Sequence, residues 1–235
     1  MNIVTSSDSN LFHCLKELAK SVRKFYGKPI IVYDLGLTES QKQILDAVII
    51  PISIDEGINF QLCHTHKPFC VKHYFENYSE PMIFVDVDCL FAEKVEESGF
   101  DVGITYEHKR KSRRIRIINS GVIFFNVPAN ELVDRWANEC SKPSTKSDQR
   151  ALWNILSETV DLQKHKDIQQ WRGLKIKIFD GHVYNDCRFT RRGKIVHFKG
   201  TRHRKDIYEK LMAGCEKGKN VRKMFKELER GKNPV

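Results

Sequence analysis

The stretch Ile83-Phe84-Val85-Asp86-Val87-Asp88-Cys89-Leu90-Phe91 sets two carboxylates two residues apart in an otherwise apolar, β-favouring run. Successive side chains of a strand alternate between its faces, so Asp86 and Asp88 are expected to point the same way. Like charges at the end of a buried strand repel each other and are costly to desolvate unless a positive group lies between them. A hard divalent cation that also binds a phosphate would meet that need.

Two other interpretations of this acid pair stay open at this point. An Asp-x-Asp pair is often an exposed turn, although the apolar residues 82–85 before it are unusual for one. A phosphatase of the haloacid-dehalogenase type also carries a strand-end Asp-x-Asp. There the motif usually opens the domain, whereas here a complete strand and helix unit precedes it. The motif therefore indicates phosphate chemistry, and its position has to decide which kind.

The bulk composition limits the class of protein. A chain of 235 residues is long enough for one domain with a substantial core. Seven scattered cysteines without a C-x-x-C pair are typical of reduced thiols, and neither a signal peptide nor a long apolar run is found, so a cytoplasmic location is expected. Lys and Arg (40) exceed Asp and Glu (30), which favours an anionic partner, but no nucleic-acid-binding motif accompanies the charge.

Hydrophobic periodicity predicts alternating strands and helices at the start of the chain. Strands are expected at 2–5, 29–34 and 47–52, and helices at 11–25 and 41–46. Further helices are expected at 67–78, from Pro128, at 150–159 and at 206–230, the last broken by Gly214 and Gly218, and further strands at 101–106, 122–126, 176–179 and 195–198. This order is typical of an α/β fold with a mostly parallel central sheet flanked by helices.

The carboxyl ends of the predicted strands carry the polar clusters. The turn 6–10 follows the first strand, and the acid pair ends a later one. Ligands of such sheets bind beyond the carboxyl ends of the strands, so both clusters are expected to line one crevice. The absence of G-x-G-x-x-G and Walker sequences argues against a dinucleotide oxidoreductase and against a P-loop enzyme.

Several other residues are candidates for the same crevice. Asn119-Ser120-Gly121 lets the backbone approach a ligand closely, unless it is a simple β-bulge. Lys67, Lys72 and His73 are candidate phosphate contacts. His197 ends a strand before a cationic loop, which favours a metal or phosphate contact, although a lone strand histidine is more often structural. The basic run 109–114 is either a solvated loop or an anion site.

Taken together, five short motifs resemble the GT-A glycosyltransferases, most closely the family 8 sugar transferases that include lipopolysaccharide galactosyl- and glucosyltransferases and glycogenin. They are Ile3-Val4-x-x-x-Asp8-x-Asn10, Asp86-x-Asp88, Asn119-Ser120-Gly121, Asp148-Gln149 and His197-Phe198-x-Gly200. The resemblance covers residues 2–205 and implies the GT-A fold for a catalytic domain 1–205, with 206–235 as a basic helical tail. It also implies transfer of a hexose from a nucleotide-diphosphate sugar, most often a UDP-hexose, to a glycan, lipid-linked or protein acceptor with retention of configuration.

The resemblance also implies roles for individual residues. Mn²⁺ or Mg²⁺ would be bound by Asp86, Asp88 and His197, and Asp148 and Gln149 would hold the donor sugar at the reacting carbon. The nucleotide donor would be bound by Asp86 as well, together with the other candidates, which are Thr5, Ser6, Asp8, Asn10, Lys67, Lys72, Val87, Asn119, Ser120, Gly200, Arg202 and His203.

The chain departs from the family pattern in two motifs and in its length, since it is shorter than many relatives and a trimmed acceptor-binding lobe is expected. Ser9-Asn10-Leu11 stands where the family has Asp-Asn-Tyr, so an aromatic partner of the base would come from Phe12 or be missing. His203, between Arg202 and Arg204, replaces a lysine expected near the diphosphate. A sugar-phosphate nucleotidyltransferase and a non-catalytic sugar-nucleotide binder remain alternatives.

The basic end of the chain has two interpretations. From His197 onward the sequence has 12 Lys or Arg residues against 5 Asp or Glu. Such a segment can contact an anionic membrane at its surface, where lipid-linked acceptors would lie. It can also be a helix packed on the core with its charges in water.

Overall fold

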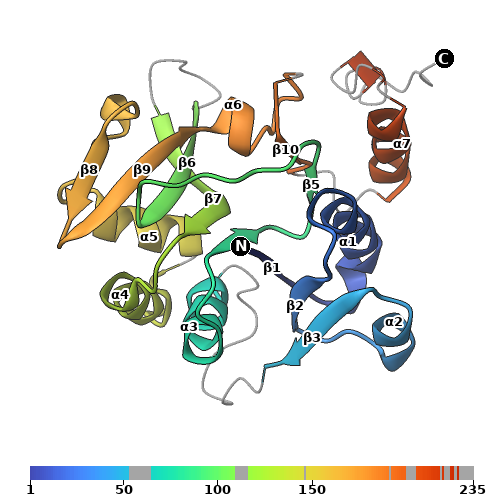
Figure 1. Ribbon diagram of the computed structural model, residues 1–235, viewed down its shortest axis with the longest axis horizontal. Coiled ribbons are helices and arrows are strands. Elements are labelled where there is room, and N and C mark those ends of the chain that lie inside the picture. The colour runs from blue at the N-terminus through green and yellow to red at the C-terminus, as the bar shows by residue number, and fades with distance from the viewer. Residues whose placement is uncertain are drawn as a thin grey trace.

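The computed structural model describes residues 1–52, 65–108, 116–145, 147–190, 192–199, 205–217, 219, 223–224 and 227. It is built on an eight-stranded sheet of order β3-β2-β1-β4-β7-β6-β9-β8, with a second sheet formed by β5 and β10 (Figure 1). The strands are β1 Asn2–Ser7, β2 Ile30–Asp34, β3 Ala47–Pro51, β4 Met82–Val85, β5 Cys89–Phe91, β6 Val102–His108, β7 Arg116–Phe125, β8 Ile168–Trp171, β9 Leu174–Asp180 and β10 Ile195–His197. The helices are α1 Phe12–Tyr26, α2 Glu39–Gln43, α3 Lys67–Asn77, α4 Asn130–Cys140, α5 Asp148–Leu156, α6 Gly181–Tyr184 and α7 Lys205–Glu216.

The large sheet is mostly parallel, as the order of elements predicts. β3, β2, β1 and β4 pair in parallel, and β6 pairs with β9 in parallel. β7 is antiparallel to both β4 and β6, and β8 is antiparallel to β9, so these two strands run against the other strands of the sheet. The carboxyl ends of β1, β4, β6 and β9 therefore meet at one edge.

Two apolar layers cover the two faces of this sheet. One layer contains α1, α7 and the small sheet β5-β10, and the other contains α3, α4 and α5. The alternation of β1 shows how the layers form, because Ile3 packs into the first and Val4 into the second. Both residues are almost completely buried.

The C-terminal helix α7 belongs to the first layer. Ile207, Tyr208, Leu211 and Met212 pack into the same core as α1, so these residues match the interpretation of a helix packed on the core. The expected break at Gly214 is wrong, because α7 continues through this residue to Glu216. No helix among the described residues is long and apolar enough to cross a membrane.

Several elements differ from their predicted bounds. β7 begins at Arg116 rather than at Val122, because it pairs with β6 along its full length, and α4 begins at Asn130 rather than at Pro128. The short strands β5 and β8 and the helix α6 were not expected from periodicity. Elements of three or four residues are too short to show a hydrophobic period.

Candidate functional site

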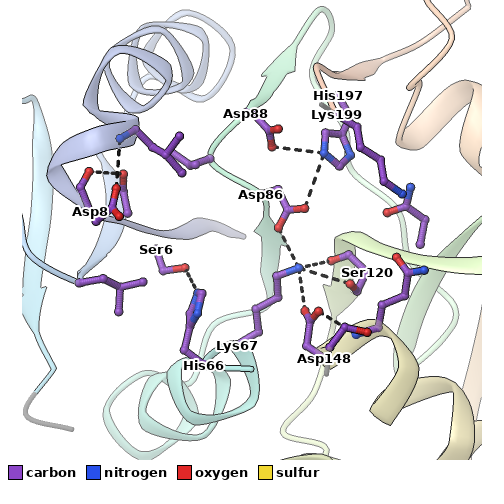
Figure 2. A pocket seen from close by; sticks show the side chains of 17 residues that line it. Ser6, Asp8, His66, Lys67, Asp86, Asp88, Ser120, Asp148, His197 and Lys199 are labelled. Atoms are coloured by element: carbon purple, nitrogen blue, oxygen red, sulfur yellow. Dashed lines mark hydrogen bonds and ion pairs between the residues drawn. The ribbon is translucent and has the colours of Figure 1, made fainter. Parts of the chain in front are cut away.

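A pocket of about 480 Å³ lies at the carboxyl edge of the large sheet. Eleven sequence-predicted residues line it: Ser6, Asp8, Lys67, Asp86, Val87, Asp88, Asn119, Ser120, Asp148, Gln149 and His197. Their side chains come from the ends of β1 and β4, from β7, from the N-termini of α3 and α5, and from β10 (Figure 2). The fold thus brings together residues that lie far apart in the sequence.

Asp86, Asp88 and His197 form a group that we call the Asp-Asp-His group. One potential ligand atom from each residue lies within 4.8 Å of the others. His197 Nε2 lies 3.2 Å from Asp88 Oδ1 and 3.6 Å from Asp86 Oδ2 (Figure 2). Asp88 and His197 are 0% and 2% exposed, so the group lies in a buried part of the pocket.

The small sheet brings His197 to the acid pair. β5 follows Asp88 directly and pairs antiparallel with β10, with Cys89 opposite His197. The backbone N–H of Phe198 also donates to the carbonyl of Asp88, at 2.9 Å. The pairing of β5 with β10 therefore places His197, from near the C-terminus, beside two carboxylates from the middle of the chain.

The orientation of the His197 ring is set by Asn185. His197 Nδ1 lies 2.7 Å from Asn185 Oδ1, and Asn185 Nδ2 donates to Thr105 Oγ1 at 2.8 Å. Because the amide oxygen of Asn185 accepts, Nδ1 carries the proton and Nε2 turns its lone pair toward the carboxylates when the ring is neutral. Metal-binding histidines usually have this kind of partner on the other ring nitrogen.

The charge environment of His197 favours a positive group at this position. Burial lowers the pKa of His197, but the nearby Cys187 and Asp88 outweigh it and hold the pKa well above its usual value. Either a proton on Nε2 or a cation between Nε2 and the carboxylates satisfies these charges. The donor set of two carboxylates and one imidazole suits a divalent ion.

Gly121 gives the His197 ring its space. A Cβ atom at residue 121 would lie 2.6 Å from both Cε1 and Nδ1 of His197, which is closer than atoms can pack. The glycine stands in an irregularity of β7, where the register with β6 shifts between Ile104 and Thr105. The polar triplet therefore contains the β-bulge that the sequence offered as one alternative, and the side chain that its backbone approaches closely is His197.

Lys67 connects the Asp-Asp-His group to the start of α5. Its ammonium group lies 2.8 Å from Asp86 Oδ1 and 2.9 Å from Asp148 Oδ2, and it donates to the Ser120 carbonyl at 2.9 Å (Figure 2). Burial lowers the pKa of Lys67, but the carboxylates of Asp148 and Asp86 outweigh it and raise the pKa above its usual value. Lys67 is therefore a buried, charged lysine.

Asp148 begins α5 with its carboxylate directed into the pocket. Its Oδ1 accepts a hydrogen bond from the backbone N–H of Gln149 at 2.7 Å, while Ser147 caps the helix by accepting from Arg150. Ser147 performs the capping, so the Asp148 carboxylate is available to Lys67. Position near the helix dipole alone does not explain this contact.

The end of the pocket at β1 is built differently. Ser6 Oγ lies 2.5 Å from His66 Nε2, and Asp8 Oδ1 accepts from the backbone N–H groups of Asn10 and Leu11. Leu11 and Leu35 add apolar surface here. The hydrogen bonds of Asp8 are thus local ones that shape its own turn.

Some predicted residues lie away from the pocket lining. Thr5 is fully buried and donates to the Val85 carbonyl, Asn10 bonds to the Asp8 side chain, and Lys72 pairs with Asp134 on the exposed side of α3. Phe12 packs against the core layer of α1. Gly200, Arg202, His203 and the run 109–114 lie outside the described residues.

Of the six other lining residues, Ser7 belongs to the predicted polar turn 6–10, whereas five were not identified from the sequence: Leu11, Leu35, His66, Ser147 and Lys199. His66 directly precedes the predicted helix with its candidate Lys67, which is the one signal that could have indicated it. Lys199 pairs with Glu107 from the end of β6 at 2.9 Å. This contact crosses between strands and leaves no pattern in the sequence.

Known structures share this architecture. A glycosyltransferase involved in the glycosylation of the major capsid of PBCV-1 superposes with a TM-score of 0.55 at 13% identity, covering 87% of this chain and 97% of its own. The galactosyltransferase LgtC, in complex with donor and acceptor sugar analogs, gives a TM-score of 0.49 at 14% identity, covering 91% of this chain and 96% of its own. No protein-family model matches the chain, and the search of curated proteins gave no match.

The likeness to the first of these structures establishes the fold. The chain has the GT-A fold of glycosyltransferases, as the five motifs implied. At this level of identity the likeness concerns the fold, and what the pocket does has to be argued from its own residues.

Proposed function

We propose that this protein is a metal-dependent glycosyltransferase that moves a hexose from a nucleotide-diphosphate sugar to a glycan, lipid-linked or protein acceptor. The observation that carries the proposal is the convergence of Asp86, Asp88 and His197 in a pocket that also holds Asp148 and Gln149. This arrangement lies at the carboxyl edge of a sheet with the GT-A fold. The alternatives of a phosphatase nucleophile or an exposed acid pair do not require a histidine in this position.

The Asp-Asp-His group would hold Mn²⁺, or Mg²⁺ less readily. Mg²⁺ favours all-oxygen ligand sets, whereas Asp86, Asp88 and His197 offer two oxygens and a nitrogen. A bound divalent ion would neutralise the negative charge that develops on a departing diphosphate. Asn185 keeps the proton on His197 Nδ1, so that Nε2 faces the ligand position.

Asp148 and Gln149 would bind the donor sugar. Lys67 and the Gln149 backbone fix the two carboxylate oxygens of Asp148, so this side chain is held in one orientation before a ligand arrives. Ser120 and Asn119 also line the pocket, and the Ser120 carbonyl accepts from the same Lys67. Asp148 would accept hydrogen bonds from sugar hydroxyls, and the Gln149 amide would lie beside the reacting carbon.

We propose retention of the anomeric configuration. The resemblance to family 8 implies retention. A glutamine amide is a poor nucleophile, so a covalent intermediate on Gln149 is disfavoured, and attack by the acceptor on the face that the diphosphate leaves is the proposed route to retention. The anomeric configuration of the product, measured by NMR, tests this step. An inverted product would contradict it.

The β1 end of the pocket would bind the nucleotide. Ser6, Asp8 and His66 present hydrogen-bonding groups, and Leu11 and Leu35 present an apolar surface for a base and ribose. A UDP-sugar is the proposed donor because the family implies it. Residues 200–204, with three basic side chains besides Gly200 and Thr201, would contact the diphosphate.

We also propose that the basic C-terminal segment contacts an anionic membrane. Lys217, Lys219 and Lys223 are exposed, and they follow the part of α7 that packs on the core. In a flotation assay with anionic liposomes, the wild type should float with the liposomes, and the variant with all three lysines changed to Gln should not. Substitution is the better test, because deletion from Asp206 would remove core residues.

A panel of UDP- and GDP-sugars tests the central proposal. With Mn²⁺, the donor should stabilise the protein thermally and release nucleotide diphosphate, and EDTA should abolish both effects. Stabilisation without release in the presence of diverse acceptors would identify a non-catalytic binder. Formation of a nucleotide sugar from a sugar phosphate and a nucleoside triphosphate would identify a nucleotidyltransferase. Binding of no sugar nucleotide would overturn the proposal.

A further inference from the structure

The ammonium group of Lys67 is fully engaged by the protein. An ammonium group has three N–H donors, and Lys67 has three acceptors within 3 Å, one each from Asp86, Asp148 and the Ser120 carbonyl. Its side chain is 8% exposed. A phosphate would have to displace one of these partners, so the geometry favours a role other than the phosphate contact that the sequence indicated.

Lys67 contacts one oxygen of Asp86 and one oxygen of Asp148. The second oxygens of these two carboxylates point to different parts of the pocket. Asp86 Oδ2 faces His197 Nε2, at 3.6 Å, whereas Asp148 Oδ1 accepts from the Gln149 backbone, at 2.7 Å. Lys67 therefore lies between the Asp-Asp-His group and the start of α5. Figure 2 shows this central position.

Without Lys67 the pocket would hold Asp86, Asp88 and Asp148 as three neighbouring carboxylates. Such a cluster repels itself, and a divalent cation could gain by binding between Asp86 and Asp148 instead of beside His197. Lys67 already supplies a positive charge between those two residues. The carboxylate oxygens that face His197, which are Asp86 Oδ2 and Asp88 Oδ1, lie away from the contacts of Lys67 and are the ones offered to a metal ion.

We infer that Lys67 is a positioning residue that divides the acidic pocket into two sides. One side, Asp86 Oδ2 with Asp88 and His197, takes a divalent metal ion, and the other, Asp148 with Gln149, is kept for the sugar. This inference rests on the proposed function. It assigns Lys67 an action through its neighbours rather than on the substrate.

The first test measures thermal unfolding of the metal-free protein in EDTA. In the wild-type background, Asp148→Asn should lower the Tm by about 5 °C or more, because Lys67 loses a buried partner. In a Lys67→Met background the same substitution should raise the Tm, because it relieves carboxylate repulsion. A fall of the Tm in both backgrounds would overturn the inference.

The structure offers a matched control on the same helix. Lys72 and Asp134 also pair at 2.7 Å, but both side chains are 51% exposed. Asp134→Asn should change the Tm by about 2 °C or less with or without Lys72→Met. If Lys67→Met does not fold, the double variant Lys67→Met/Asp148→Asn is measured instead, because it removes the ammonium group and one of its two carboxylate partners together. This variant should fold, and its failure to fold would also count against the inference.

The second test counts Mn²⁺ ions by calorimetry, with the metal alone as the probe. The wild type should bind one ion. Lys67→Ala should either bind a second ion or bind its ion at a different position, and in both cases the new site should depend on Asp148. The double variant Lys67→Ala/Asp148→Asn should therefore again bind one ion. If Lys67→Ala binds one ion with wild-type affinity, the inference about Lys67 is overturned and the proposed function is not affected. No Mn²⁺ binding by the wild type overturns the proposed function together with that role.

Discussion

The two ends of the pocket are held in different ways. At the end formed by β4 and β10, Asp88, His197 and Lys67 are buried, and each contacts a partner from a distant part of the chain. At the β1 end, Asp8 and Leu11 are partly exposed, and the carboxylate of Asp8 bonds to its own turn. The first end is fixed by buried contacts between distant segments, whereas the carboxylate of Asp8 at the second end is oriented by its own turn.

This difference indicates a division of labour within the proposed function. Groups that stabilise developing charge act best when they are held in place before the ligand binds and are shielded from water. Groups that recognise a nucleotide can be more exposed, because each contributes only part of the binding free energy. Substitutions at the first end should therefore abolish catalysis, and substitutions at the second should weaken donor binding.

The largest effect is expected for Asp88→Asn. This change removes one proposed metal ligand at a fully buried position and keeps the shape of the side chain. Mn²⁺ affinity should fall by about 100-fold or more, and turnover should fall to the level of the wild type in EDTA. Calorimetry and nucleotide release measure the two effects, with circular dichroism as the control for the fold. Full turnover by this variant would remove the assignment of the metal site.

Gly121→Ala should come next. The added Cβ would lie 2.6 Å from the His197 ring, so the ring has to move away from Asp86 and Asp88. We expect a loss of about 1–3 kcal/mol of stability from this overpacking, together with weaker Mn²⁺ binding. Denaturant unfolding and calorimetry test both parts. Gly173→Ala, in the turn between β8 and β9, should leave Mn²⁺ binding unchanged.

Asn185→Ala should weaken metal binding without removing a ligand. His197 Nδ1 would lose its acceptor, and Mn²⁺ affinity should fall about 10- to 100-fold, as for other partners of metal-binding histidines. Asn185→Asp keeps an acceptor oxygen for His197 Nδ1, although it loses the donor to Thr105 Oγ1 and adds a negative charge, and it should bind Mn²⁺ more tightly than the Ala variant. Equal affinities of the Ala variant and the wild type would show that Asn185 does not orient the ring.

Leu35→Ala should have the smallest effect. It removes apolar surface at the β1 end, so the KM for the donor should rise about 3- to 10-fold, with kcat nearly unchanged. Steady-state kinetics with varied donor distinguish the two constants. A fall in kcat with an unchanged KM would mean that the two ends of the pocket do not divide binding and catalysis as proposed.

Much of this site could be predicted from the sequence because its motifs are local. Asp86-x-Asp88 after an apolar run indicated the strand β4, but strand alternation does not set the direction of the two carboxylates, because residues 86–88 form a turn between β4 and β5, closed by the Cys89 N–H donating to the Asp86 carbonyl at 3.0 Å. Both carboxylates still face His197, through this turn and the pairing of β5 with β10. The strand and helix order also predicted the sheet edge where these residues meet, since ligands bind at the carboxyl ends of parallel strands. The GT-A fold followed from the motifs in combination.

The sequence alone could not show which polar side chains already have partners. Thr5, Asn10 and Lys72 match the pattern of ligand-binding residues, yet their side chains bond to Val85, Asp8 and Asp134. Conversely, His66 and Leu35 line the pocket without belonging to any motif. Hydrogen-bond partners depend on distances between separate elements, which a linear pattern does not contain.

Local sequence by itself determined the acid pair, the strand that ends in it and the order of elements that builds the sheet, because side-chain alternation and turn chemistry act between near neighbours. Tertiary structure decided the position of His197 beside Asp88, the space that Gly121 leaves for its ring and the burial of Lys67 between two carboxylates. These depend on the pairing of β5 with β10, the irregularity of β7 and the packing of α3 against the sheet. Each joins segments that are distant in the chain, so the physical interactions that specify it arise only in the folded protein.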